Sequence, residues 1–580
     1  MSGIFKELKN YRRESILAPL LKLAEAGLEL IVPLVVADII DKGIGANSGK
    51  EYIIGRCLIL LLLGILGLAL SVTAQYFAAK AAVGVATDMR SKMFARIGTL
   101  SFADLDRIGA PTLITRMTSD INQVQTGINM SLRLLLRAPV IVFGAMIMAF
   151  TIDVKGALIF AAVTVVLFII VFAVMAITLP KYKEVQSKLD NVLAKTRENL
   201  SGSRVIRAFR REDAEISEFN AENFSLAASQ IKAGKISSVL NPATYAVINI
   251  AIIILIKSGA VRVNAGLLTQ GAVVALYNYM LQILVELIKL ANLIITITRS
   301  VASGSRVFGV FDTSSAVEDD FGAGYTEGTD SAEAVRFDSV SFSYGGSGDD
   351  VLRNISFCIK KGSTFGIIGG TGSGKSTLIS LIPRFYSAVS GKVSVFGRDV
   401  TEYDAEALRS KVAVVMQKPV LFKGTIRENL MIGASERTEA ELLDALHTAC
   451  GDDILEVKEN GLDSAVEQNG RNFSGGQKQR LTIARALINK PEILILDDST
   501  SALDFSTEAK LRENISHLED KPTVITVSQR TSSVMHCDSI LVMDDGKAVG
   551  FGTHSELMKN CDLYKEIYAS QFGTEASDNE

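Results

Sequence analysis

Long runs of apolar residues dominate the first half of the chain and end near residue 310. A helix rises about 1.5 Å per residue, so about 20 apolar residues cross a hydrocarbon core of about 30 Å. Any one such run could be a buried core helix, but a succession of them favours a multi-pass membrane domain. The pattern predicts six spans, at about 16–40, 55–79, 134–152, 157–180, 243–261 and 271–298.

Basic residues are distributed unevenly between these predicted spans. They are frequent before the first span and in the connections 80–133 and 181–235, while the other connections are short and carry few. Lysine and arginine are enriched on the cytoplasmic side of membrane proteins. We therefore expect the N-terminus, the two basic connections and the C-terminal half to be cytoplasmic, and the chain to lie in the lipid bilayer of the cell membrane.

The two basic connections are longer than a hairpin between spans requires. They contain few glycines and prolines, so we interpret them as long cytoplasmic extensions of the flanking helices. We expect one interruption in each, at 101–111 and at about 211–215. Such interruptions make turns that can dock on another domain.

The composition changes after the last predicted span. Residues 311–334 are acidic and rich in Gly, Ser and Thr, which is typical of a linker. Short β-branched runs, such as 364–368 and 523–527, then alternate with amphipathic stretches and predict an α/β domain. The expected organisation is a helical transmembrane domain (1–310), a linker (311–334), an α/β domain (335–575) and a tail (576–580).

The bulk numbers agree with a membrane protein and narrow the chemistry. The chain has 580 residues, 48% of them hydrophobic, and a mean hydropathy of +0.29. Its net charge of −3 gives no reason to expect a nucleic-acid partner. The five cysteines and four histidines are scattered without a zinc spacing, so we expect reduced thiols.

The first candidate for chemistry is the segment 369–376, which reads GGTGSGKS and matches GxxxxGK[ST]. It follows an apolar strand and opens a predicted helix over 376–386, as a phosphate-binding loop requires. The glycines let backbone N–H groups surround nucleotide phosphates, and the helix N-terminus favours their negative charge. Lys375 should reach the β- and γ-phosphates, and the Ser376 hydroxyl should bind Mg²⁺.

A second element supports nucleotide binding. The segment 493–498 reads ILILDD, an apolar strand that ends in two acids and is typical of a Walker B motif. Its first acid, Asp497, should hold Mg²⁺.

Further motifs make this domain resemble the ABC ATPases. The segment 473–487, FSGGQKQRLTIARAL, is similar to their signature motif, and SALD at 501–504 is similar to their D-loop. Gln417 is similar to the Q-loop glutamine, and Tyr344 to the aromatic residue that stacks on adenine. With six predicted spans ahead of it, the whole chain resembles a half-transporter of the ABC exporter class.

The resemblance implies a site for ATP and Mg²⁺. Expected magnesium ligands are Ser376, Gln417 and Asp497. In dimers of this family, each ATP lies between one chain's phosphate loop and the other chain's signature motif. Ser474, Gly475, Gly476 and Gln477 should therefore complete the ATP site of a partner. Contacts with this chain's own ATP are expected from Tyr344, Gly369, Gly370, Thr371, Gly372, Ser373, Gly374, Lys375, Ser376, Thr377 and Gln417.

Two positions depart from the family pattern. The Walker B aspartate is usually followed by a catalytic glutamate, and here it is followed by Asp498; the usual switch histidine is replaced by Gln529. Aspartate is one methylene shorter, and a displacement of about 1 Å can cost on the order of 10²-fold in rate. Glutamine can donate a hydrogen bond to the γ-phosphate but cannot become cationic. Together they predict a site that retains ATP and hydrolyses it weakly.

A weak site beside an intact signature motif favours one subunit of a heterodimeric exporter. The partner half-transporter would supply the glutamate and the histidine. Two alternatives stay open: a slow homodimeric exporter that uses Asp498 as a base, and a regulatory or gating subunit that only binds ATP. The exported molecule also stays open between a drug, a lipid and a peptide, because apolar runs do not encode specificity.

Three of the charged residues in the first predicted span lie on one helix face: Lys22, Glu25 and Glu29. Charged groups at membrane depth usually face a cavity or a partner. In one reading Glu25 and Glu29 line a substrate cavity and favour cations. In the other, Lys22 and Glu25 form a structural pair and Glu29 bonds to a neighbouring helix. Two further residues, Glu286 and Lys289, are expected to neutralise each other.

Overall fold

The computed structural model describes residues 2–46, 48–313, 325, 327–329, 331–346, 348–434 and 437–572. They form two compact units. The helical unit comprises residues 1–96 and 111–312, and the α/β unit comprises residues 97–110 and 313–580. Most of the predicted linker and the whole predicted tail lie outside the described residues.

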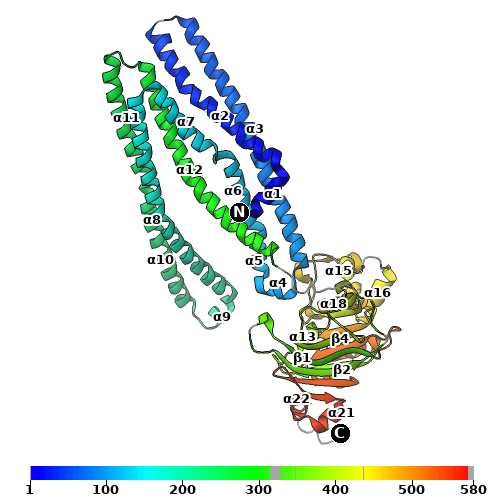
Figure 1. The fold of residues 1–580 in the computed structure, drawn as a ribbon. Helices are drawn as coiled ribbons and strands as arrows, with labels where there is room; N and C mark the ends of the chain where they lie inside the picture. The colour runs from blue at the N-terminus through cyan, green and yellow to red at the C-terminus, as the bar shows by residue number, and fades with distance from the viewer. Residues whose placement is uncertain are drawn as a thin grey trace. The chain divides into compact units, whose positions relative to one another are not determined.

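Long helices build the helical unit, because its extended apolar runs contain few helix breakers (Figure 1). Helix α12 packs along α2, α6 and α7, while α8 packs along α10 and α11. The elements of this unit are α1 (Ser2–Leu8), η1 (Lys9–Tyr11), α2 (Arg12–Asp38), η2 (Ile39–Gly45), α3 (Lys50–Thr99), α5 (Ala110–Thr115), η3 (Arg116–Asp120), α6 (Ile121–Leu134), α7 (Arg137–Ile152), α8 (Val154–Ser201), α9 (Ser203–Ala208), α10 (Glu212–Ser238), α11 (Leu240–Asn264) and α12 (Gln270–Phe311).

Five helical stretches in the described part of the chain are long and apolar enough to cross a membrane. The first predicted span, 16–40, is not among them. It does form a helix, α2, which is 27 residues long. Lys22, Glu25 and Glu29 interrupt its apolar character, so the count of six spans stays a prediction. The five stretches are Lys50–Thr99, Ala110–Ile152, Val154–Ser201, Glu212–Asn264 and Gln270–Phe311.

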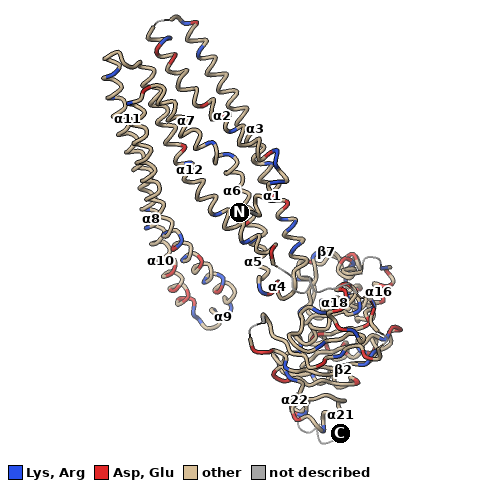
Figure 2. The backbone as a smooth tube through the Cα atoms, in the orientation of Figure 1, with Lys and Arg blue, Asp and Glu red and all other residues tan. Residues whose placement is uncertain are grey.

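Charged residues are unevenly distributed along the long helices. Figure 2 shows few of them along the middle of α7, α11 and α12, and many near α9, where α8 and α10 meet the turn. The segment around α9 is therefore one of the polar parts of the helical unit.

The two predicted interruptions have different outcomes. The first is confirmed: α3 ends at Thr99, Ser101 caps the short helix α4 (Phe102–Ile108) and Gly109 follows with a φ of +78°. The second prediction, at about 211–215, is wrong in its position. The break begins at Gly202, contains α9 and ends before Glu212, where α10 starts.

A largely parallel sheet forms the centre of the α/β unit. The strand order of this sheet is β12-β11-β3-β10-β9-β6, and only β12 runs antiparallel to its neighbour. A second, antiparallel sheet has the order β2-β1-β4-β5, and β7 pairs with β8. The strands are β1 (Glu333–Phe342), β2 (Leu352–Lys360), β3 (Thr364–Gly369), β4 (Ser390–Val395), β5 (Arg398–Asp399), β6 (Val412–Val415), β7 (Gly424–Thr425), β8 (Ala465–Val466), β9 (Ile493–Asp497), β10 (Thr523–Ser528), β11 (Ser539–Asp544) and β12 (Lys547–Gly552).

The central strands are buried on both faces, as their continuous apolar runs predict. The helix after the phosphate loop is shorter than predicted. It ends at Ser380 instead of continuing to 386. Leu381 and Ile382 form tighter turns to Leu378 and Ile379, and Pro383 has no N–H to continue the helical hydrogen bonds. The helices of this unit are α4, α13 (Lys375–Ser380), α14 (Ala405–Lys411), α15 (Ile426–Leu430), α16 (Glu439–Thr448), α17 (Asp452–Glu456), α18 (Gly475–Leu487), α19 (Phe505–Ser516), α20 (Thr531–Val534), α21 (His554–Asn560) and α22 (Asp562–Phe572); short 3₁₀ turns are η4 (Tyr344–Gly346), η5 (Gly461–Asp463) and η6 (Gln468–Gly470).

Helix α4 packs within the α/β unit although it lies far from that unit in the sequence. The ring of Phe102 lies 4.4 Å from that of Phe385, centroid to centroid. The hydroxyl of Tyr386 donates a 2.5 Å hydrogen bond to Asp106. Burial and this carboxylate raise the pKa of Tyr386. The first predicted interruption therefore forms a docked helix.

Candidate nucleotide-binding site

The carboxyl ends of three parallel strands bring the predicted site residues together. Gly369 ends β3, Asp497 ends β9, and Gln529 follows β10, which lies between the other two strands. Ligands of open α/β sheets bind at this edge. The sheet order thus assembles residues that are up to 160 positions apart (529 − 369) in the sequence.

The phosphate loop needs its glycines for conformation and for space. Gly372 and Gly374 have φ angles of +82° and +94°, which L side chains rarely adopt. A Cβ atom on Gly369 would lie 2.2 Å from the carbonyl oxygen of Met543. Helix α13 begins immediately afterwards, at Lys375, so its N-terminus faces the loop. This is the arrangement that surrounds phosphates with backbone N–H groups.

Lys375 is held inside this loop. Its ammonium donates hydrogen bonds to the carbonyl oxygens of Gly369 at 2.8 Å and Gly370 at 2.6 Å. Burial lowers the pKa of Lys375, while Asp498 and Asp497 act in the opposite direction. The sequence-predicted phosphate ligand therefore lies next to both acids of the Walker B segment.

Two of the three predicted magnesium ligands, Ser376 and Asp497, are in direct contact, and the third, Gln417, contacts the adjacent acid Asp498. The Ser376 hydroxyl donates to Asp497 at 3.1 Å, and burial raises the pKa of Asp497. The Gln417 amide donates to Asp498 at 3.2 Å. These are oxygen-bearing groups of the kind that Mg²⁺ prefers beside phosphate oxygens. Among the described residues, no group of three or more His, Cys, Asp or Glu could hold a metal. The donor set fits Mg²⁺ that is bound together with a nucleotide.

The two unusual residues, Asp498 and Gln529, lie beside this cluster. The Asp498 backbone has a φ of +45°, a region in which aspartate is tolerated, and its N–H donates to Val527 at 2.8 Å. Gln529 is exposed, and its side-chain oxygen accepts a 3.4 Å hydrogen bond from Thr371 in the phosphate loop. Both line a pocket of about 680 Å³. Asp498 and Gln529 thus face the same space next to the phosphate loop.

Two further residues at this site were not identified from the sequence. Gln571 on α22 accepts a hydrogen bond from the Thr531 N–H and donates one to the Gln529 carbonyl, both at 2.8 Å. Arg530 donates to the Ser501 carbonyl at 3.3 Å, which joins the switch segment to the D-loop. No local motif marks either residue, because each acts on chain segments that are distant in sequence.

The signature motif forms the start of a helix. Ser474 caps α18, and the Gln477 side chain accepts from the Ser474 N–H at 3.0 Å, which completes a capping box. Gly475 and Gly476 occupy the first turn. This leaves a glycine-rich helix N-terminus that suits an anion.

Tyr344 lies beside the phosphate loop. Its hydroxyl is 3.0 Å from that of Thr377, and the edges of Phe342 and Tyr386 contact its ring. Its side chain is about half exposed. The ring is therefore anchored at its hydroxyl, while about half of the side chain stays accessible.

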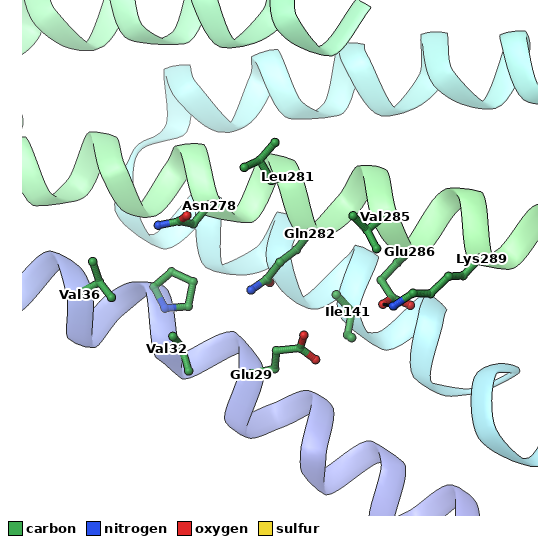
Figure 3. Close-up of a pocket in the computed structure, with 11 residues that line it drawn as sticks. Glu29, Val32, Val36, Ile141, Asn278, Leu281, Gln282, Val285, Glu286 and Lys289 are labelled. Carbon is green, nitrogen blue, oxygen red and sulfur yellow. Dashed lines mark hydrogen bonds and ion pairs between the residues drawn. The ribbon is translucent and has the colours of Figure 1, made fainter. Parts of the chain in front are cut away.

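The charged residues of α2 are paired in the helical unit. Lys22 bonds to Glu25 at 2.6 Å and to Ser71 at 2.8 Å. Glu29 accepts a 2.6 Å bond from Arg137, which sequence reasoning did not single out. These contacts match the structural reading of Glu25 and Glu29, but Glu29 also lines a pocket of about 380 Å³ (Figure 3).

The expected pair of Glu286 and Lys289 forms at 2.8 Å, and Glu286 also accepts a 2.6 Å bond from Arg137. The arginine at the start of α7 therefore connects acids from α2 and α12. The pair predicted from spacing is part of a larger ionic cluster.

A helical unit with membrane-crossing helices, joined to an α/β unit with a phosphate loop, a Walker B strand and a signature helix, defines an ATP-dependent membrane transporter. The family model "ABC transporter transmembrane region" matches residues 15–287, and the model "ABC transporter" matches residues 352–501. The chain belongs to the ABC transporter family. The predicted fold class, a helical transmembrane domain followed by an ABC nucleotide-binding domain, is confirmed, and the chain is a multi-pass membrane protein.

Relatives match over the full length. The uncharacterized ABC transporter ATP-binding protein YfiB of Bacillus subtilis is 36% identical, over 99% of each chain. The ATP-binding/permease protein YgaD of the same organism, named for multidrug export, is 32% identical over 98% of this chain and 99% of its own. The structure of a bacterial Atm1-family ABC exporter with ATP bound shares the fold, with a TM-score of 0.81, 24% identity and coverage of 97% and 98%.

Proposed function

We propose that this chain is one subunit of a heterodimeric ABC exporter, in which its own ATP site is hydrolytically weak. The proposal depends on two features that occur together at the carboxyl edge of the parallel sheet. The loop that binds phosphate is complete, while Asp498 and Gln529 stand where catalysis needs a glutamate and a histidine. Gln417 bonds to the Asp498 carboxylate and Thr371 to the Gln529 amide, so both side chains have partners within the chain.

Export across the cell membrane is supported by the multidrug-export name of one relative and by the exporter whose fold the chain shares. The basic connections 80–133 and 181–235 support a cytoplasmic N-terminus and a cytoplasmic α/β unit. The proposed domain boundaries, at about 310 and 335, follow the change from long apolar runs to a more polar sequence.

The residues of the site then have distinct roles. Lys375 and the N-terminus of α13 bind the phosphates, and Ser376, Gln417 and Asp497 hold Mg²⁺, which neutralises phosphate charge when bound. Tyr344 stacks on the adenine. The first turn of α18, from Ser474 to Gln477, completes the partner's site, where a glutamate polarises water.

Helix α4 supports a route from ATP binding to the spans. It follows directly on α3, and its Phe102 and Asp106 contact Phe385 and Tyr386. We infer that α4 and the break at 202–211 transmit closure of the ATPase dimer to the membrane helices.

The first prediction concerns the purified chain. It should bind ATP, yet hydrolyse it at least about 10²-fold more slowly than the pair assembled with its partner, because Asp498 is short of the catalytic position. Nucleotide binding and phosphate release measured on the same preparation test this. Lys375→Ala is the control that should lose ATP binding.

Asp498→Glu should leave transport by the pair intact, whereas removal of the partner's glutamate should stop it. Robust hydrolysis by the chain alone that Asp498→Asn abolishes would favour the slow homodimer instead. A purified pair that hydrolyses ATP without moving any solute would favour the gating subunit. These two outcomes separate the alternatives from the heterodimeric exporter.

The second prediction concerns Gln571. Its two hydrogen bonds hold the backbone on either side of Arg530, and a net hydrogen bond contributes about 0.5–1.5 kcal/mol. Gln571→Ala should therefore lower the preference of this site for ATP over ADP by about two- to tenfold, since Gln529 reaches the γ-phosphate that only ATP carries. Fluorescent-nucleotide displacement measures both affinities.

Gln571→Glu gives a graded comparison, because a carboxylate still accepts from Thr531 but cannot donate to Gln529. Ser570→Ala is the matched control, because the Ser570 hydroxyl bonds to the Ile567 carbonyl of the same helix. Equal losses of ATP and ADP affinity in Gln571→Ala would show a structural role for α22 rather than a positioning role at the switch segment.

A further inference from the structure

A pocket of about 380 Å³ lies among α2, α7 and α12 of the helical unit (Figure 3). Val32, Val36, Ile141 and Leu281 contribute to its apolar wall, and its polar side chains include Glu29, Gln282, Glu286 and Lys289. Ligand pockets combine such an apolar lining with a few polar groups and usually measure roughly 300–1,000 Å³. The volume lies at the small end of this range, which favours a small amphiphile over a whole membrane lipid.

Two buried acceptor atoms on α12 have no hydrogen-bond partner among the described residues. Glu286 is only 3% exposed, and its Oε2 atom has no hydrogen bond within the described part of the chain; the same holds for Oε1 of Gln282. Figure 3 shows Gln282 reaching from α12 toward α2, and Glu29 reaching from α2 into the same space. Buried acceptors without donors are costly. Neither atom is accessible from the pocket, so a ligand there meets the exposed charges of Glu29 and Lys289 instead.

The charges around the pocket sum to zero. Arg137 bonds to both Glu29 and Glu286, and Lys289 bonds to Glu286, so two acids face two bases. A simple cation therefore gains little net attraction, in contrast to the cation-binding cavity expected from Glu25 and Glu29. The two charges with the most accessible side chains are Glu29 on α2 and Lys289 on α12, each 42% exposed. They offer a ligand one negative and one positive group.

We propose that this pocket binds a small zwitterionic amphiphile. Its ammonium group donates to Glu29, its anionic group faces Lys289, and its apolar part lies against Val32, Val36 and Leu281. The proposal rests on the proposed export function, for which it names the substrate class. It involves no bond formation or electron transfer.

The test uses four forms of one dipeptide, Leu-Phe, which differ only in charge. The free dipeptide is zwitterionic, its C-terminal amide is cationic, its N-acetyl form is anionic, and the doubly capped form is neutral. Their affinities for the full-length chain in lipid nanodiscs, without nucleotide, are measured by calorimetry. The zwitterion should bind at least about tenfold more tightly than each capped form, which corresponds to about 1.4 kcal/mol.

Two variants test which side chain binds each charged group of the ligand. Glu29→Gln should weaken the zwitterion and the cationic amide about tenfold each. Lys289→Met should weaken the zwitterion by a similar factor and leave the cationic amide unchanged or tighter. Glu25→Gln is the matched control, because Glu25 lies one turn away on the same helix, pairs with Lys22 and does not line the pocket.

Equal affinity for all four forms, tighter binding of the cationic amide, or no binding at millimolar concentration would overturn the proposal. A Glu29→Gln chain that binds like the unmodified chain would do the same. If a variant does not fold, the selectivity among the four forms on the unmodified chain still decides. Because no nucleotide is present, these results are separate from the ATPase comparison that tests the proposed function.

Discussion

Replacement of Ser474 with arginine should reduce ATP hydrolysis by the assembled transporter by about 10²-fold or more, while ATP binding to this chain stays unchanged. Ser474 caps α18, whose first turn holds Gly475 and Gly476. In the proposed heterodimer this turn meets the γ-phosphate in the partner's site, where loss of one preorganised donor costs about 10²–10³-fold. A long side chain at the cap also blocks the phosphate sterically.

The control separates this effect from damage to the fold. Thr438 caps α16 with the same capping box, formed with Glu441. Thr438→Arg should cost similar helix stability, typically about 1 kcal/mol, without changing hydrolysis. Phosphate release and nucleotide binding are measured for both variants with the same partner. Normal hydrolysis by the Ser474→Arg pair would contradict the asymmetric arrangement, because the competent site would then not need this signature motif.

The sequence predicted those features of the site that lie in contiguous segments. The segment 369–376 and the acids at 497–498 have local patterns, and a buried parallel strand precedes each of them. The interruption at 101–111 was also predictable, since it needs only a capping serine and a glycine. The second interruption was misplaced because Gly202, rather than the charged residues after it, ends α8.

Contacts between distant segments were not predictable in this way. Gln571 meets Gln529 across 42 residues, and Arg137 meets Glu29 across 108. No periodicity or motif links these positions, because their proximity follows from how whole helices pack. The single-chain structure therefore changes the interpretation of the membrane charges more than that of the nucleotide site. Arg137 balances the charges of Glu29 and Glu286, and no sequence pattern had indicated an arginine partner for either acid.

Arg137 provides the second large expected effect. Its guanidinium donates to Glu286 and to Glu29, both at 2.6 Å, and the side chains of Arg137 and Glu286 are only 9% and 4% exposed. Breaking a buried ion pair by removal of one partner costs about 3–5 kcal/mol when the other charge is left uncompensated. Lys289 still bonds to Glu286 here, so we expect a loss at the lower end of this range. Arg137→Met should therefore lower the thermal unfolding temperature of the full-length chain in nanodiscs strongly.

Part of this loss should be recoverable by removing the charge left behind. Arg137→Met combined with Glu286→Gln should unfold at a clearly higher temperature than Arg137→Met alone, because a neutral amide costs less to bury than a carboxylate. Glu25→Gln combined with Arg137→Met is the comparison that should give no such recovery, since Glu25 pairs with Lys22. Equal unfolding temperatures for the two double variants would mean that Arg137 stabilises α7 by packing. In that case Glu286 would not depend on Arg137 for charge compensation, and Lys289, at 2.8 Å, would be the cation that balances this carboxylate.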